Sequence, residues 1–357
     1  MSRVPGVCLV LRYFTIGGLE RVVIGLANAL VARGIDTRVI VLHTGRRNAL
    51  ITELDPRVDL ALLSGPGRKR MADLRELTRG RIVHLNFGDG YILPRVRAAL
   101  AGRTVVVSYM SVYRHKRTWL ANRFDRFWAS RASAIVAVSH AVKEFCVQDV
   151  GIPAERVTVI PCVIEPVAAD PAPRETNGAL RAISLASLYP HKNQAVILDG
   201  VATARRAGVD VRLTVVGDGP MMAGLYRRAM ELGIRGEVEW YGALSRRDLY
   251  QPLLAASDVF LSASRFEGLP LSVQEGMAHG LPLVLSDIPP HRESAGEGAL
   301  YFPADDPVIL AERLGTLAAD HERREALARD SRAGLARFDF NRFVDDHVAV
   351  YRRAVSA

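Results

Sequence analysis

Two glutamates with a fixed spacing carry the strongest chemical signal in the sequence. Glu267 precedes a Gly-Leu-Pro turn, and Glu275 lies eight residues further on, inside a stretch with helical periodicity. A strand, the turn and a helix start would gather backbone N–H groups around one point, which is a ready site for an anion. A diphosphate would fit there, with Glu267 against a sugar and Glu275 against a ribose. The segment between the two acids that forms this site begins with Gly268, Leu269, Pro270, Leu271 and Ser272.

A lysine and two glycine turns point to the same kind of ligand. Lys192 stands at the start of a predicted helix, where a cation is unfavourable by about 0.3–1 kcal/mol unless an anion binds beside it. Gly17 and Gly18 follow the first predicted strand, and Gly217 opens a Gly-Asp-Gly-Pro turn after a later one. The alternatives are solvated charges and glycines that serve only tight turns. We expect Lys192 and the glycines to contact a bound anion.

These residues belong to a chain that alternates short apolar runs with amphipathic stretches. This alternation is typical of βα units around parallel sheets that are buried on both faces. Such sheets bind ligands at the carboxyl ends of their strands, where the polar and glycine clusters fall. The predicted strands form two series, which are 7–12, 37–43, 81–86, 104–108, 134–138 and 157–160, then 180–185, 211–216, 238–241, 259–262, 283–285 and 299–302.

A proline-rich segment separates the two series and predicts two domains with a linker. We expect an N-terminal Rossmann-like domain over 1–165, a linker over 166–179 and a C-terminal Rossmann-like domain over 180–337. Residues 338–357 should form a final helix, with Val344, Val348 and Tyr351 on one apolar stripe.

Charge is distributed unevenly between the two predicted halves. Residues 1–165 hold 25 Lys and Arg against 13 Asp and Glu, whereas the remainder holds 22 against 25. A basic N-terminal half favours an anionic partner such as a phosphorylated substrate or a lipid surface. The three cysteines form no CxxC pair, which argues against a disulfide framework and fits a reducing cytoplasm. The longest early apolar run is too short for a signal peptide.

Several common catalytic motifs are absent from the sequence. No lysine follows a glycine, which excludes the GxxxxGK[ST] phosphate loop, and Met222 stands where a GxGxxG fingerprint needs its third glycine. HExxH, GxSxG and Asp-x-Asp are also missing. We therefore expect no metal and no cofactor, so that side chains and helix ends must counter the charge of a phosphate.

The spacing of the two glutamates resembles the E-x7-E segment of retaining glycosyltransferases with the GT-B fold, in particular glycosyltransferase family four (glycosyl transferases group 1). The segments 17–21, 188–193 and 216–220 resemble that family's N-terminal glycine loop, donor-phosphate lysine motif and turn before a helix. The resemblance covers nearly the whole chain. It implies that Lys192 and Glu267 are catalytic and that Gly17, Gly18 and Gly217 contact the donor. It implies two Rossmann-like domains facing across a cleft, with the donor held mainly by the C-terminal one and a final helix that returns to the N-terminal one.

Two positions depart from the family pattern. The arginine that usually partners the lysine is Ser187 here, and Met110 stands where members commonly place a histidine against the donor sugar. Arg265 and Arg12 are candidates, by location, for the missing positive charge. No histidine is expected to be catalytic, because a lone histidine is more often structural.

The resemblance implies a retaining, metal-independent transfer of a hexose-type sugar from a nucleoside-diphosphate sugar, expected to be a UDP-sugar, to an acceptor hydroxyl. The rival functions are a GT-B-fold nucleotide-sugar epimerase, which needs no acceptor, and a catalytically silent sugar-nucleotide-binding protein, suggested by Ser187 and Met110. The acceptor could be a polysaccharide, a lipid, an antibiotic core or a small metabolite. The oligomeric state is left open.

Basic and aromatic residues alternate in the segment 113–128. Such a helix can lie on an anionic membrane, so a peripheral contact at the inner face of the membrane is one expectation for this otherwise cytoplasmic chain. The alternative is a buried stripe made of Trp119, Phe124, Phe127 and Trp128, with arginines outside. Nucleic acid is not an expected partner, because no recognised nucleic-acid module accompanies the segment.

Overall fold

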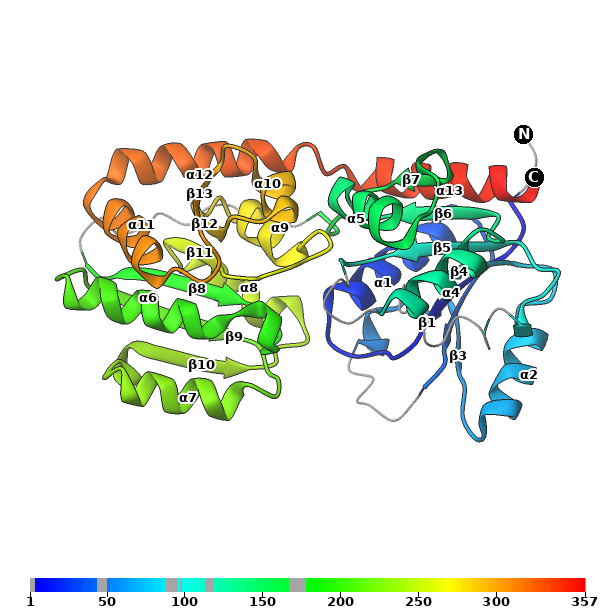
Figure 1. Ribbon diagram of the computed structural model, residues 1–357, viewed down its shortest axis with the longest axis horizontal. Helices are drawn as coiled ribbons and strands as arrows, with labels where there is room; N and C mark the ends of the chain where they lie inside the picture. Colours follow the sequence, from blue (N-terminus) through cyan, green and yellow to red (C-terminus); the bar gives the residue numbers. More distant parts are fainter. Residues whose placement is uncertain are drawn as a thin grey trace. The chain divides into compact units, whose positions relative to one another are not determined.

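Two compact units make up the chain (Figure 1). The computed structural model describes residues 4–43, 50–87, 96, 98–112, 118–166 and 178–356. Met1–Glu165 and Phe338–Ala357 form the first unit, and Pro166–Arg337 form the second. Most of the predicted linker, and residues 113–117 of the basic aromatic segment, lie outside the described residues.

The first unit is built on a parallel sheet whose central strands are buried on both faces. Valine, isoleucine and leucine fill these strands, as a sheet covered by helices on both sides requires. In the described residues the strand order is β3-β2-β1-β4-β5-β6-β7. The strands are β1 (Val7–Leu11), β2 (Thr37–Val41), β3 (Asp59–Leu62), β4 (Ile82–Leu85), β5 (Val105–Tyr109), β6 (Ala134–Ala137) and β7 (Val157–Val159).

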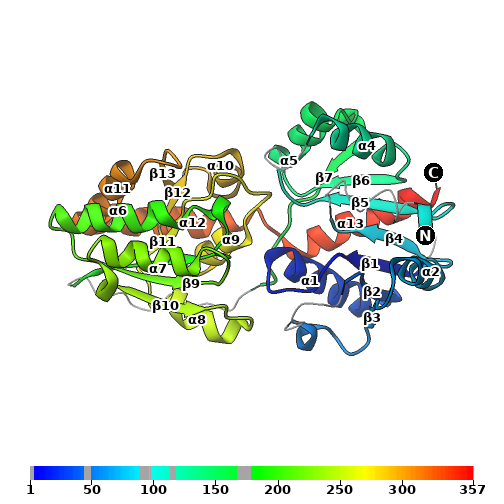
Figure 2. The same ribbon diagram turned by 60° about the horizontal axis from the view of Figure 1, so that its bottom comes forward.

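Strand β3 is the one that the sequence does not predict. It lies at the edge of the sheet, and its residues are half-buried or exposed. The helices of this unit that cover or flank the sheet are α1 (Gly18–Ala32), α2 (Gly67–Leu77), α4 (Trp119–Ala129), α5 (His140–Phe145) and α13 (Phe340–Ser356) (Figure 2).

A buried polar cluster attaches the C-terminal helix α13 to this sheet. The hydroxyl of Tyr351 lies 2.7 Å from His84 Nδ1, and the hydroxyl of Ser108 lies 2.6 Å from His84 Nε2. His347, one turn before Tyr351, packs its ring 5.6 Å from that of His84. Val344 and Val348 are buried beside them. The apolar stripe predicted for the last helix therefore does face the protein interior.

The second unit repeats the parallel architecture with the described strand order β10-β9-β8-β11-β12-β13. The strands are β8 (Leu180–Leu185), β9 (Val211–Val216), β10 (Val238–Gly242), β11 (Val259–Ser262), β12 (Leu283–Ser286) and β13 (Ala299–Phe302). The helices are α6 (Gln194–Arg206), α7 (Met222–Glu231), α8 (Arg247–Ala255), α9 (Leu271–Ala278), α10 (Pro289–Ala295), α11 (Pro307–Ala319) and α12 (His321–Leu335). The carboxyl ends of β8, β11 and β12, which are neighbours in this sheet, therefore converge at one edge.

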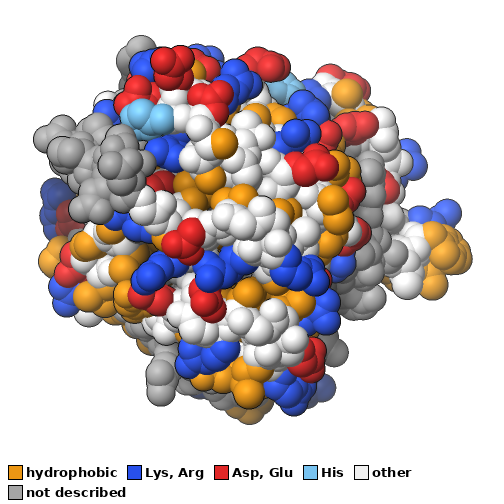
Figure 3. All heavy atoms as spheres, turned by 90° about the vertical axis from the view of Figure 1, so that its left-hand side faces the viewer, with side chains coloured by type: hydrophobic (Ala, Val, Ile, Leu, Met, Phe, Trp, Pro, Cys, Tyr) orange, Lys and Arg blue, Asp and Glu red, His pale blue; other side chains and the backbone are white. Residues whose placement is uncertain are grey.

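Three features of the described residues bear on the expectations from composition: the surface charges, the cysteines and the apolar content of the helices. The face of the second unit shown in Figure 3 has acidic and basic side chains interspersed. Cys8, Cys146 and Cys162 are free and buried. In the described part of the chain, none of the helices is both long enough and apolar enough to cross a membrane.

The two histidines of the α13 cluster predict a pH-dependent stability. Burial lowers the pKa of His347 from 6.5 to about 4, and burial together with the charge of His347 lowers the pKa of His84 well below its usual value. The unfolded chain therefore binds more protons than the native one below pH 6.5. The free energy of unfolding should fall as the pH drops from 6.5 toward 4, by up to about 1.4 kcal/mol per pH unit for each histidine.

Urea unfolding between about pH 7.5 and 5 measures this dependence. His347→Gln should flatten the slope, whereas the same change at exposed His321 should leave it intact. Equal slopes for wild type and His347→Gln would contradict the assignment.

Candidate active site

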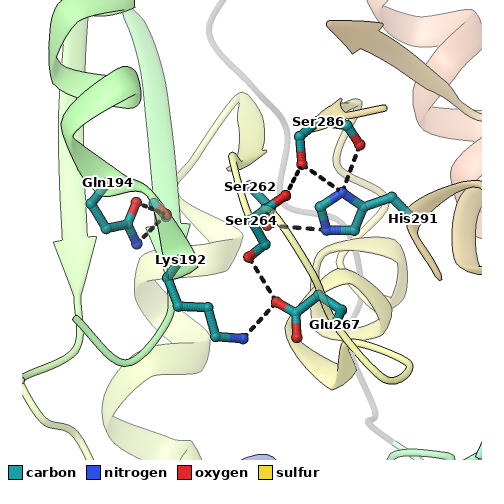
Figure 4. A network of polar contacts seen from close by, with 8 residues as sticks. Lys192, Gln194, Ser262, Ser264, Glu267, Ser286 and His291 are labelled. Carbon is teal, nitrogen blue, oxygen red and sulfur yellow. Dashed lines mark hydrogen bonds and ion pairs between the residues drawn. The ribbon is translucent and has the colours of Figure 1, made fainter. Parts of the chain in front are cut away.

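Lys192 and Glu267 form an ion pair at the edge where the strands of the second unit converge (Figure 4). Lys192 Nζ lies 2.5 Å from Glu267 Oε1, and the two side chains are only 16% and 10% exposed. A close pair with little access to water interacts more strongly than a surface pair, because solvent screens it less. The structure thus brings together the two residues predicted to be catalytic.

Backbone contacts fix the turn that presents Lys192. The residue ends a short 3-10 turn (Pro190–Lys192) between β8 and α6, and Asn193 follows it with a left-handed φ of 55°. The Asn193 side chain donates to the Ala304 carbonyl at 2.7 Å. The backbone N–H of Arg265 donates to the His191 carbonyl at 2.8 Å. The lysine turn is therefore joined directly to the loop that carries Glu267.

A chain of buried hydroxyls and one histidine reaches the same oxygen of Glu267 that Lys192 contacts. Ser264 donates to Glu267 Oε1 at 2.7 Å, and Ser286 donates to the Ser264 carbonyl at 2.6 Å. His291 Nδ1 lies 2.8 Å from the Ser286 carbonyl, and its Nε2 lies 3.2 Å from the Ser262 hydroxyl. Because Nδ1 faces a carbonyl, it carries the ring proton, and Nε2 accepts from Ser262.

The electrostatics of this cluster favour a charged glutamate and a neutral histidine. Burial alone raises the pKa of Glu267, but the charge and hydrogen bond of Lys192, with smaller contributions from His291 and Ser264, bring it below its ordinary value. Burial lowers the pKa of His291, although the carboxylate of Glu267 opposes this. The site therefore holds one buried cation and one buried anion at neutral pH.

The segment after Glu267 leads directly into helix α9. Gly268, Leu269, Pro270 and Leu271 are buried, and the helix begins at Leu271 with no side-chain cap among the described residues. The first N–H groups of a helix have no partner within the helix, and they give its start a partial positive charge. Ser272 is the half-buried residue of this first turn. The predicted anion segment therefore does lie at a helix N-terminus.

Glu275 lies inside α9 and is buried with a different set of partners. The Tyr250 hydroxyl donates to Glu275 Oε1 at 3.1 Å, and Arg247 Nε lies 3.6 Å from the same oxygen. Both partners come from α8. No hydrogen-bond partner reaches the buried Glu275 Oε2 from the residues that the structure describes. That oxygen retains the capacity to accept a hydrogen bond from a ligand.

Gly17 and Gly18 belong to the first unit, where they form the turn from β1 into α1. Gly17 precedes the helix, and a Cβ on it would lie 2.6 Å from Glu20 Oε2. Glu20 accepts hydrogen bonds from the Thr15 backbone N–H at 3.1 Å and from its hydroxyl at 2.7 Å. Burial raises the pKa of Glu20. Glu20 thus helps to hold the glycine turn in place. The sequence places Glu20 in the same motif as Gly17 and Gly18, but it does not reveal these contacts.

Gly217 has a backbone role that requires glycine. Its φ is 147°, and a Cβ would lie 1.8 Å from the Ala186 carbonyl oxygen. The backbone N–H of Leu188 donates to the Asp218 carbonyl at 2.9 Å, which joins the loops after β8 and β9. The predicted contact of Gly217 with a donor stays a prediction.

The two positions that depart from the family pattern lie in different units. Ser187 lies in the loop after β8, and the guanidinium of the candidate replacement, Arg265, binds Asp305 at 2.7 Å. Met110 lies in the first unit after β5. Within the described ranges, no group of three or more His, Cys, Asp or Glu side chains could hold a metal ion.

Sequence reasoning missed the residues that hold the two glutamates. Tyr250, Arg247 and His291 lie 24 to 28 residues from the glutamate that each one serves or faces, and only the fold brings them close. Ser264 and Ser286 do stand within two residues of the ends of predicted strands. That position is the one signal from which they could have been found.

Two family models match consecutive parts of the chain. Glycosyltransferase Family 4 matches residues 16–167, and Glycosyl transferases group 1 matches residues 170–333. The chain is also 25% identical over 274 residues to the putative glycosyltransferase EpsF of Bacillus subtilis, which covers 71% of this chain and 69% of EpsF. It is 33% identical over 152 residues to a GDP-mannose-dependent alpha-(1-6)-phosphatidylinositol dimannoside mannosyltransferase of Mycobacterium tuberculosis, which covers 42% of this chain and 38% of that relative.

Solved structures share the fold at low sequence identity. Anabaena HepE, crystallised with UDP and glucose, superposes with a TM-score of 0.82 at 19% identity, over 97% of this chain and 98% of HepE. A Staphylococcus aureus TarM mutant, crystallised with UDP, superposes with a TM-score of 0.83 at 8% identity, over 97% of this chain and 99% of that chain.

The two parallel-sheet units and these neighbours define the two-domain GT-B fold, which confirms the predicted fold class. With both halves of the chain matched by their family models, the protein belongs to the GT-B glycosyltransferases of the family 4 and group 1 type, and it is a glycosyltransferase enzyme.

The close approach at Gly217 predicts a large difference between two glycines of the second unit. Gly217→Ala should lower the free energy of unfolding by about 3 kcal/mol or more, because the new Cβ meets a carbonyl oxygen in a backbone conformation that alanine avoids. Gly224→Ala, in helix α7 with open space around it, should raise it by about 0.5–1 kcal/mol. Urea unfolding of both variants tests this, and similar stabilities would rule out the packing role.

Proposed function

We propose that this glycosyltransferase moves a hexose from a UDP-sugar to an acceptor hydroxyl, retains the anomeric configuration and needs no metal ion. The observation that carries the proposal is the little-exposed pair of Lys192 and Glu267, together with the loop that leads from Glu267 into the start of α9. A cation and a helix N-terminus suit a diphosphate, and a carboxylate suits sugar hydroxyls.

Each residue has a role in this reaction. Negative charge grows on the β-phosphate as the glycosidic bond breaks, and Lys192 with the amides of Leu271 and Ser272 would stabilise it. Glu267, kept ionised, would accept hydrogen bonds from the sugar hydroxyls. Glu275 would accept from the ribose through Oε2, which has no partner in the described residues. The departing phosphate oxygen would take the proton of the acceptor hydroxyl on the same face of the sugar.

The relatives support the choice of donor and reaction. HepE and TarM were crystallised with UDP, and one Escherichia coli relative, 25% identical over 226 residues, is named as a UDP-Gal-dependent galactosyltransferase that acts on a diphosphoundecaprenol acceptor. That alignment covers 58% of this chain and 58% of the relative. The mannosyltransferase from Mycobacterium tuberculosis uses GDP-mannose, which makes a GDP-sugar the first competitor in a donor screen.

Release of nucleoside diphosphate from the donor separates the rival functions. A transferase should release it only when an acceptor hydroxyl is supplied. An epimerase should change the donor sugar without an acceptor, and a silent binding protein should do neither while the donor still raises the thermal unfolding temperature. Either of the latter results would overturn the proposal.

Lys192→Ala should lower kcat by about 10²-fold or more, because it removes a preorganised positive charge from the leaving phosphate. The measurement is acceptor-dependent release of nucleoside diphosphate. Lys69→Ala, which removes a surface lysine paired with Asp73, is the matched control and should retain the wild-type rate. A folded Lys192→Ala enzyme with an unchanged rate would refute the role of this lysine.

Glu275→Ala should abolish the preference for the ribose hydroxyl that Glu275 binds. Calorimetry with UDP and with its 2′-deoxy and 3′-deoxy analogues measures this. The wild-type enzyme should bind at least one deoxy analogue about tenfold more weakly, since a hydrogen bond to a charged group contributes about 1.5–3 kcal/mol. The variant should bind all three alike. If it still discriminates as the wild type does, Glu275 does not bind the ribose.

A further inference from the structure

Helix α4 carries its apolar side chains on the outside. Trp119, Leu120, Phe124 and Phe127 are 68%, 50%, 55% and 48% exposed. The residues that face inward are small or charged, namely Ala121, Asp125 and Ala129. The arrangement is the reverse of an ordinary surface helix, which buries its apolar stripe. It also overturns the alternative reading of this segment as a buried aromatic stripe with arginines outside.

The exposed residues form one continuous face. With about 100° between successive residues, Trp119, Arg123, Phe127, Leu120 and Phe124 follow one another within about 140° of the helix circumference. The opposite face packs against the turn Cys146–Val150, where the Asn122 side chain donates to the Asp149 carbonyl at 2.9 Å. The helix is therefore anchored through its polar and small residues, and the aromatic face is left for a partner.

Arginines accompany the aromatic residues on this face. Arg123 and Arg126 are exposed, and the guanidinium of Arg131 lies 3.6 Å from the centre of the Phe127 ring. Residues 119–131 hold three arginines, and their one acidic residue, Asp125, is buried. The face is thus both apolar and of a single sign of charge.

We propose that this face of α4 binds the surface of an anionic lipid bilayer. Aromatic and leucine side chains that enter the boundary between headgroups and acyl chains, with arginines at the level of the headgroups, are the pattern of an interfacial helix. A second copy of the chain fits less well, because it would bring two faces of like charge together. The positive excess of residues 1–165 adds to the attraction for anionic lipid.

Flotation of the full chain with lipid vesicles tests the proposal. The protein should float with vesicles of phosphatidylcholine mixed with phosphatidylglycerol, float less with phosphatidylcholine alone, and be released as salt is added. Trp119→Ser with Phe124→Ser should lower the partition coefficient by about tenfold or more, through loss of buried apolar area. Met230→Ser with Leu249→Ser, at residues of the second unit that are 59% and 49% exposed, is the matched control and should bind as the wild type does.

The arginines are tested separately from the aromatic residues. Arg123→Gln and Arg126→Gln should each weaken binding to the anionic vesicles by about fivefold, which corresponds to ~1 kcal/mol per cation, with little effect on neutral ones. Circular dichroism checks that every variant is folded. The proposal is wrong if the wild type stays with neither vesicle, or if the aromatic variant binds equally well. It is also wrong if gel filtration shows a dimer that the aromatic variant converts to a monomer.

Discussion

The ion pair between Lys192 and Glu267 is the interaction that the surrounding residues of the second domain must keep intact. Two opposite charges that are mostly removed from water must keep each other as partners, since an unpaired buried charge costs several kcal/mol. Ser264 donates to the same carboxylate oxygen that Lys192 contacts, and Ser264 is in turn fixed by Ser286. The neutral His291 completes the cluster without adding a second positive charge. The result is a rigid pair whose net charge is close to zero.

The parallel sheet explains why these residues meet. Lys192, Ser264 and Ser286 follow β8, β11 and β12, which lie side by side although the chain visits other strands between β8 and β11. The carboxyl ends of parallel strands lie at the same edge of the sheet. The loops that follow them are therefore close together, and even short side chains such as serine can meet there. Glu275 obtains its support differently, from Tyr250 and Arg247 on the preceding helix α8.

The sequence predicts the features that local patterns determine, but not those that depend on tertiary contacts. The strands with buried β-branched runs, the stripe of α13 and the position of Glu267 before a helix all follow from short-range periodicity and turn chemistry. The edge strand β3 has no buried run to reveal it. The outward face of α4 was open to either reading, because the same amphipathic spacing fits a helix turned by half a revolution. The inward side carries Asn122, whose side chain donates to the Asp149 carbonyl, and this contact between residues distant in the sequence has no local pattern that predicts it.

Under the proposed function, the serine at position 187, where the family has an arginine, affects how the Lys192–Glu267 pair responds to a bound diphosphate. A diphosphate that binds at the start of α9 would compete with Glu267 for Lys192, because Ser187 stands where the family pattern has its second cation. Glu267 then loses its cation and must replace it by hydrogen bonds, and the hydroxyls of a sugar attached to that diphosphate can supply them. A bare nucleoside diphosphate brings the competing anion without those hydroxyls, and it leaves a buried carboxylate less well satisfied. Under the proposed function, the Lys192–Glu267 pair therefore favours binding of the intact nucleotide-sugar over binding of the nucleoside diphosphate that the reaction releases.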